Sequence, residues 1–108
     1  MEPNLEQNLQ RIRVVIHAPN TEAVARARNN ARNLLKAAPD ADVRILANAG
    51  GVAAVLDAPQ ADTDHLTLLC ENTLGRIGRS AQSPLQTVPS SILALVMMQR
   101  EGWIYVRA

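Results

Sequence analysis

The chain has 108 residues, a formal net charge of +1 and 47% hydrophobic residues. These values suit one globular domain over residues 1–108, and they argue against a nucleic-acid-binding protein, which usually carries a large basic excess. The single cysteine excludes an internal disulfide bond and a zinc site built from several cysteines, so we expect no bound metal. No apolar run is long enough for a membrane helix and no signal peptide is visible, so we expect a cytoplasmic protein without membrane contact.

The first half of the chain predicts two buried strands joined by a long helix. Residues 13–17 and 43–48 are short apolar runs, and continuous apolar character is typical of strands covered on both faces. Between them, residues 21–38 carry an apolar stripe at helical spacing, which ends before Pro39. Upstream, residues 3–10 could form a short helix or a loose arm.

Two further features of this half concern surface and ligand binding. Arg28, Arg32 and Lys36 recur every fourth residue, which predicts a helix face turned towards water. Ala49-Gly50-Gly51 predicts a tight turn before a short helix over 51–57. This turn lacks the spacing of a dinucleotide-binding motif and the lysine of a P-loop, so we expect no nucleotide cofactor.

The second half predicts three more strands. Residues 65–69 form an apolar run after a polar loop over 59–64, and residues 71–80 are predicted to be helical or a structured loop. A minimal strand at 87–88 precedes a helix that begins after Ser90 or Ser91 and runs to about residue 101. Gly102 is a natural left-handed stop, and residues 103–106 form the last strand.

Alternating strands and helices with short links indicate an α/β fold. We predict a three-layer α/β/α sandwich around a mostly parallel five-stranded sheet. The helix over 91–101 is apolar all round, whereas a surface helix normally has a polar face. A second subunit covering this helix would explain the pattern, so we predict a homo-oligomer. Trp103 and Tyr105 share one face of the last strand and could extend that interface or line a pocket.

Cys70 is the candidate chemical group of the chain. It ends the apolar run of the third strand, and ligands of parallel sheets bind at the carboxyl ends of strands. A helix beginning there would favour the thiolate, and Arg76 or Arg79 could help, while the carboxylate of Glu71 would oppose it. His17 ends the first strand at the same edge and could act as a base for the thiol, or it could simply be hydrogen-bonded.

Other polar residues near this edge are candidate binding groups. Asn48, Asn72 and Thr73 follow strand ends, where they could bind a ligand or close turns. Arg76, in the segment Gly75-Arg76-Ile77-Gly78-Arg79, could bind an anion, or the segment could be a water-facing helix surface.

Several segments together resemble the DsrE/DsrF-like family of sulfur-relay proteins. The resemblance covers roughly residues 12–107 and is carried by the order and spacing of six segments: 14–17, 31–35, 43–48, Leu68-Leu69-Cys70-Glu71-Asn72-Thr73-Leu74, 88–90 and 99–106. It implies a compact α/β domain that assembles as a dimer, trimer or hexamer. In relay members the cysteine matching Cys70 carries a persulfide, which implies a sulfur-donor or sulfur-acceptor protein as partner.

The chain departs from this family pattern at two positions. Thr73 stands where some relay members have a second cysteine, and Glu71 places an acidic neighbour beside the thiol. Two functions therefore follow from the sequence. The first is a sulfur carrier or sulfurtransferase-like protein in which Cys70 is the persulfide-bearing nucleophile. The alternative is a non-catalytic homo-oligomer that binds a small molecule or anion, with Cys70 serving only in packing.

Overall fold

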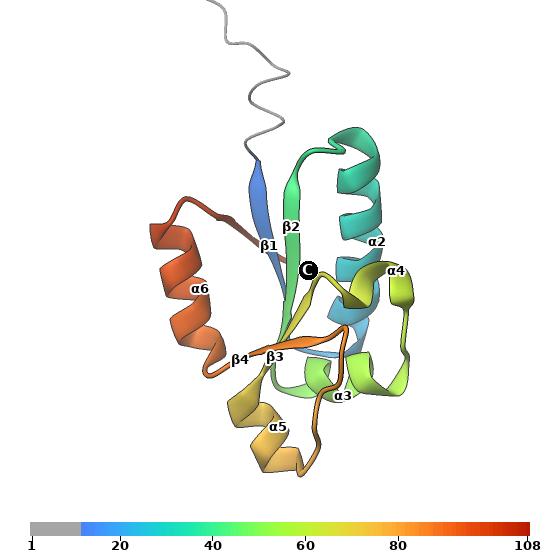
Figure 1. Ribbon diagram of the computed structural model, residues 1–108, viewed down its shortest axis with the longest axis vertical. Helices are drawn as coiled ribbons and strands as arrows, with labels where there is room; N and C mark the ends of the chain where they lie inside the picture. The colour runs from blue at the N-terminus through green and yellow to red at the C-terminus, as the bar shows by residue number, and fades with distance from the viewer. Residues whose placement is uncertain (1–11) are drawn as a thin grey trace, which may run out of the picture.

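A computed structural model describes residues 12–108, which form an α/β/α sandwich around a five-stranded, all-parallel sheet (Figure 1). The predicted fold class is therefore confirmed. The strands are β1 Arg13–Ala18, β2 Asp42–Ala47, β3 Thr67–Cys70, β4 Gln86–Val88 and β5 Ile104–Arg107. The helices are α2 Thr21–Ala37, α3 Gly50–Asp57, α4 Ala61–Asp64, α5 Glu71–Ile77 and α6 Ser91–Arg100. The predicted leading segment over residues 3–10 lies outside the described residues.

The helix ends follow local capping chemistry. Asn20 caps α2, because its side-chain oxygen accepts a hydrogen bond of 2.8 Å from the backbone N–H of Ala23. Ser90 caps α6 in the same way at Leu93. Gly102 follows α6 with a φ of 98°, as the sequence predicts for a left-handed stop.

Two expectations from the sequence are wrong. The segment 59–64 is not simply a loop, since it contains the short helix α4. Arg28 does not face water, since it is 4% exposed and forms an ion pair of 3.2 Å with the buried Asp64. Arg32 does lie at the surface, where it binds Asp62 at 2.7 Å. Because Arg28 and Arg32 are four residues apart, they do lie on one side of α2, but α4 covers Arg28.

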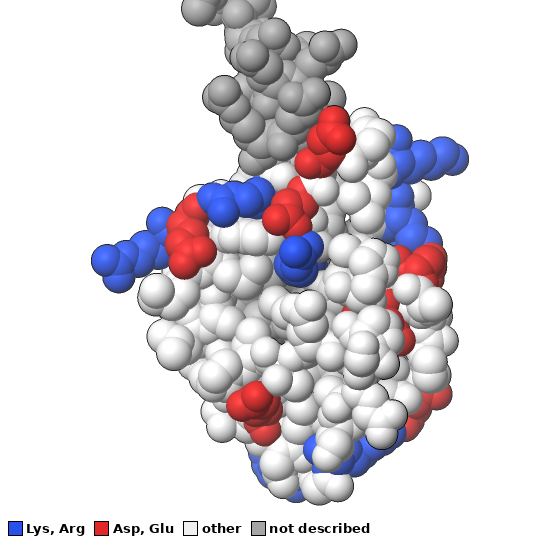
Figure 2. Space-filling model, in the orientation of Figure 1, with Lys and Arg blue, Asp and Glu red and all other residues white. Residues whose placement is uncertain are grey.

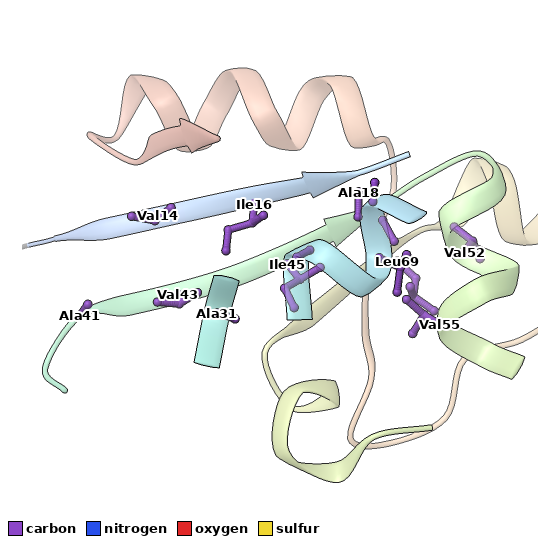
Figure 3. Packing of buried hydrophobic residues seen from close by; sticks show 14 of the residues in the cluster. Val14, Ile16, Ala18, Ala31, Ala41, Val43, Ile45, Val52, Val55 and Leu69 are labelled. Carbon is purple, nitrogen blue, oxygen red and sulfur yellow. The ribbon is translucent and has the colours of Figure 1, made fainter. Parts of the chain in front are cut away.

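The order of strands in the sheet is β4-β3-β2-β1-β5. The chain therefore steps outward from β1 to β4, and then returns past the whole sheet to place β5 beside β1. Apolar residues of α2, α3 and α5 pack on one face of the sheet, whereas those of α6 pack on the other. Figure 3 shows this arrangement, with α6 on the side of the sheet opposite α2 and α3.

The two faces of the sheet are covered unequally. The larger core cluster joins Val14, Ile16, Val43 and Ile45 to the apolar stripe of α2 and to α3 (Figure 3). The smaller cluster, under α6, has Val15, Leu46 and Leu95 as its buried members. Val and Ile dominate the strands because β-branched side chains pack well on a pleated surface.

Among the described residues, no helix has both the length and the apolar character that crossing a bilayer requires.

Candidate functional site

Polar side chains from several strands meet at the carboxyl edge of the sheet. The parallel register aligns Ala18 with Ala47, Ala47 with Leu69, and Cys70 with Val88. Side chains alternate along a strand, so His17, Asn48 and Cys70 all fall on the face that α6 covers.

The connections that leave β3 and β4 diverge at this edge. After Cys70 the chain enters α5, whose Leu74 packs with the α2–α3 cluster, and after Val88 it enters α6 on the opposite face. Neighbouring strands whose connections go to opposite faces define a topological switch point, where open α/β sheets bind ligands. Cys70 is therefore located at the position in this fold that most favours a site.

Cys70 is 3% exposed and is the N-cap residue of α5, and its pKa responds to Thr73 in the first turn of α5 and to Ser91 in the first turn of α6. Burial tends to raise its pKa. The backbone N–H groups and the hydroxyls of Thr73 and Ser91 outweigh burial, because all four can donate hydrogen bonds to a thiolate. Together they lower the pKa of Cys70 from 9.0 to about 7. The thiol can thus be substantially ionised near neutral pH.

A chain of hydrogen bonds extends across the sheet from Ser91, one of the residues that lower the pKa of this thiol. The Asn48 amide nitrogen donates to Ser91 Oγ at 3.2 Å, and Asn48 Oδ1 lies 2.9 Å from Nε2 of His17. Nδ1 of the same ring lies 2.7 Å from the hydroxyl of Tyr105 on β5. These contacts therefore connect His17 to Ser91 indirectly, by hydrogen bonds through Asn48.

The other predicted binding residues are exposed and are not among the groups that shift the pKa of Cys70. Asn72 and Arg76 are exposed on α5, and Arg76 is in the last turn, at the opposite end of the helix from Cys70. Arg79 forms an ion pair of 2.7 Å with Asp57. The carboxylate of Glu71 accepts a hydrogen bond of 2.8 Å from Thr87. None of these charged groups is among the causes of the lowered pKa of Cys70.

Sequence reasoning missed two members of the site. The sequence pattern indicates Ser91 only as a helix cap, and Tyr105 only as part of an interface or pocket wall. A signal for Ser91 was present, because it follows the neighbouring strand–helix junction just as Thr73 follows that of Cys70. This signal places Ser91 near Cys70 only if β4 is known to pair with β3. Trp103 packs instead in the smaller core cluster, with the guanidinium groups of Arg13 and Arg44 over its ring at 5.4 Å and 5.8 Å.

An exposed apolar surface lies beside the site. We call it the α6–β5 surface, and it comprises Ile92, Leu93, Val96 and Met97 of α6 with Tyr105 of β5, which faces the same side of the sheet. The exposed Ile104 and Val106 of β5 pair with Val14 and Ile16 and therefore face the α2 side. Ile92 is 69% exposed and Leu93 is 56% exposed. Figure 2 shows that the region over α6 carries no charge along most of its length, with charged groups gathered towards its C-terminal end.

A separate cavity of about 320 Å³ lies between the C-terminal half of α3 and the loop from α5 to β4. Its lining combines Val55, Leu56, Pro59, Pro84 and Leu85 with the polar residues Asp64, Arg79, Ser80, Gln82 and Ser83. No residue of the Cys70 site lines this cavity. Within residues 12–108, no group of three or more His, Cys, Asp or Glu side chains is arranged to hold a metal ion.

No family model and no curated protein matches the chain. Among solved structures, the chain is similar to a protein of unknown function, MTH1491 from Methanobacterium thermoautotrophicum. The two share a TM-score of 0.73 and 24% sequence identity, over 90% of this chain and 99% of that chain. At this identity the similarity establishes a shared α/β fold and nothing about activity.

Proposed function

We propose that the chain is a cytoplasmic sulfur carrier of the DsrE/DsrF-like type, in which Cys70 bears a persulfide. The observation that carries this proposal is the setting of Cys70, a single buried thiol with a pKa of about 7 at the switch point of the sheet. The thiolate is the nucleophilic form of cysteine, and a pKa near ambient pH gives the best compromise between thiolate fraction and intrinsic nucleophilicity.

The loading step is a thiolate–persulfide exchange. The Cys70 thiolate attacks the outer sulfur of a donor persulfide, R–S–SH, so that a new bond from Sγ to that sulfur forms. The S–S bond of the donor breaks, and the donor leaves as the thiolate R–S⁻ with the bonding electron pair. The proton stays on the transferred sulfur, and no external oxidant or reductant is needed.

The unloading step reverses these roles. An acceptor thiolate attacks the outer sulfur on Cys70, and Cys70 leaves as a thiolate. A leaving thiol of lower pKa departs faster, so the four hydrogen-bond donors at the sulfur assist release as well as attack. A carrier needs both steps, and one lowered pKa serves both.

The burial of Cys70 restricts the donor. Because the residue is 3% exposed, a bulky disulfide cannot approach the sulfur closely without displacing surrounding groups. A persulfide presents its transferable sulfur at the end of a thin chain of atoms. We therefore infer that the donor and the acceptor are persulfide-bearing or thiol-bearing groups that extend into the site, as a cysteine on a partner protein's flexible segment would.

The first test is the rate of Cys70 alkylation by iodoacetamide in the native protein across pH, followed by intact mass after incubation with a persulfide donor. We expect an apparent pKa of about 7 and a mass gain of one sulfur that a reducing thiol removes. Cys70→Ser should show neither change. Alkylation that requires denaturant, or no mass gain on native protein that is readily alkylated, would contradict the carrier role.

We also propose that the α6–β5 surface joins copies of this chain into a homo-oligomer. Its residues are apolar side chains on a helix and on an edge strand, and such patches on a small domain mark interfaces. Tyr105 of this surface and the neighbouring Ser91 belong to the hydrogen-bonded site, so assembly would bury the outer side of that site.

The second candidate function is a non-catalytic homo-oligomer that binds a small molecule. The cavity between α3 and the α5–β4 loop favours this second function, because a concave site of this size with mixed apolar and polar lining suits a small ligand. Since Cys70 does not line that cavity, the Cys70→Ser variant would retain both ligand binding and assembly under this function. If the wild-type protein is loaded with persulfide and Cys70→Ser loses only this loading, the result supports the carrier function.

A further inference from the structure

The two hydroxyls at Cys70 are both held by the turn between β2 and α3. The side chain of Asn48 donates to Ser91 Oγ at 3.2 Å, and the backbone N–H of Ala49 donates to Thr73 Oγ1 at 3.2 Å. A hydroxyl has one hydrogen to donate and two lone pairs that accept. Because each oxygen already accepts a hydrogen bond from the turn, its own hydrogen remains available to the sulfur.

The orientation of the Asn48 amide is fixed from its other side. Its oxygen lies 2.9 Å from Nε2 of His17, and an amide oxygen can only accept, so Nε2 carries the hydrogen. In the neutral ring Nδ1 is then an acceptor, and it receives the hydroxyl hydrogen of Tyr105 at 2.7 Å. This order of donors leaves the amide NH₂ of Asn48 directed at Ser91.

The backbone of the turn is strained next to these contacts. Ala49 has a φ of 46° and a ψ of −133°, a combination that residues with a Cβ rarely adopt. Such conformations are destabilising, and they gather at functional sites. Here the strained residue supplies the N–H that holds Thr73, while its neighbour Asn48 holds Ser91.

We propose that Asn48 is a positioning residue of the Cys70 site: held by His17 and Tyr105, it keeps the Ser91 hydroxyl donating to the sulfur. This inference rests on the proposed function in taking Cys70 as the reacting group. It adds that the reactivity of the sulfur is set from three strands away, because Tyr105 lies on the exposed edge strand β5.

The test is the apparent pKa of Cys70, measured by the pH dependence of iodoacetamide alkylation with no sulfur donor present. Loss of one hydrogen bond to a thiolate changes a thiol pKa by about one unit, so Ser91→Ala should raise it by that amount. Asn48→Ala leaves the hydroxyl in place but free to rotate, and should raise the pKa by about half a unit. In a Ser91→Ala background, Asn48→Ala should add almost nothing.

Two further single variants and one double variant complete the experiment. Asn33→Ala, on the exposed face of α2, is the matched control and should leave the pKa unchanged. If Asn48→Ala folds poorly, Asn48→Asp replaces it in the experiment, because aspartate keeps the side-chain shape of asparagine. Its carboxylate would accept the Ser91 hydroxyl hydrogen, so the pKa should rise, and Ser91→Ala should remove part of that rise.

Independent, additive changes in pKa from Asn48 and Ser91 would overturn the positioning role, as would an unchanged pKa in Asn48→Ala or Asn48→Asp. Because the thiol pKa is measured without sulfur donor, these outcomes are separate from failure of the carrier function, which would show as absent persulfide in the wild-type protein.

Discussion

At the scale of single residues, the main feature of this protein is a cysteine whose pKa is lowered by neutral hydrogen-bond donors. The thiolate of Cys70 would be held by two backbone N–H groups and two hydroxyls rather than by arginine. Neutral donors fixed by the fold need no reorganisation when charge moves from one sulfur to another. This suits a site where the negative charge alternates between Sγ and a bound outer sulfur.

The same donors couple the stability of the protein to pH. The pKa of Cys70 is about 7 in the folded protein against an ordinary value of 9.0, so between these values the unfolded chain binds more protons. The free energy of unfolding therefore rises with pH across this window. The stabilisation is complete above pH 9 and is lost as the pH falls through 7.

We expect this contribution to the free energy of unfolding to be about 2–3 kcal/mol, given the difference between the folded and unfolded pKa of the thiol. Urea unfolding of the wild-type protein and of Cys70→Ala, under reducing conditions, isolates it, because other titrating groups cancel in the difference. The wild-type protein should gain stability over the variant between about pH 6 and about pH 9. A difference that stays constant with pH would mean that the folded thiol has an ordinary pKa.

At the scale of elements, the turn between β2 and α3 connects packing to the site. Gly51 is packed so closely under the end of β1 that an added Cβ would lie 2.0 Å from the carbonyl oxygen of Ala18. Its N–H also donates to the carbonyl of Asn48 at 2.8 Å, which closes the turn. At the neighbouring Gly50, an added Cβ would meet its nearest atom, the carbonyl oxygen of Pro19, at 3.7 Å, which is ordinary van der Waals contact.

This contrast gives a paired prediction for the turn. Gly51→Ala should destabilise the protein by about 3 kcal/mol, because the backbone at Ala18 or at Gly51 must move to admit the added Cβ. The same movement should disturb the contacts of Asn48. Gly50→Ala should be neutral or stabilising by up to about 1 kcal/mol, because alanine favours the helix. Thermal unfolding of the two variants checks this. Equal stability would show that β1 and α3 do not approach so closely.

The sequence predicted the elements well because their signals are local. Continuous β-branched runs such as Val14-Val15-Ile16 can be read as buried strands without knowing their neighbours, and Pro39 and Gly102 mark helix ends by backbone geometry alone. The burial of Arg28 could not be predicted in this way. It depends on Asp64, which lies 36 residues away in the sequence.

The candidate site shows the same division. The position of Cys70 at a strand–helix junction was visible in the sequence, and so were His17, Asn48 and Thr73 as polar residues at strand ends. The donors that act on the thiol were not, because Ser91 reaches it only through the pairing of β4 with β3. Arg76 is close to Cys70 in the sequence, but it lies at the other end of α5 from Cys70.

At the scale of the whole molecule, the sandwich is unequally filled. Within residues 12–108, three helices contribute to the larger core cluster on one face of the sheet, whereas α6 alone covers the other face. The outer side of α6 is as apolar as a core helix, and β5 is an edge strand exposed along its whole length. A second copy packed on the α6–β5 surface would supply the missing layer.

This predicts that assembly depends on α6. Leu93 is 56% exposed, so replacing it with glutamate should leave the fold of one subunit intact but place a charge in a dry interface. Light scattering coupled to gel filtration should show an oligomer for the wild-type protein and a monomer for Leu93→Glu. Ala25→Glu, on the exposed face of α2, adds the same charge elsewhere and should leave the oligomer intact. A wild-type monomer at micromolar concentration, or an unchanged oligomer in Leu93→Glu, would show that this surface does not join copies of the chain.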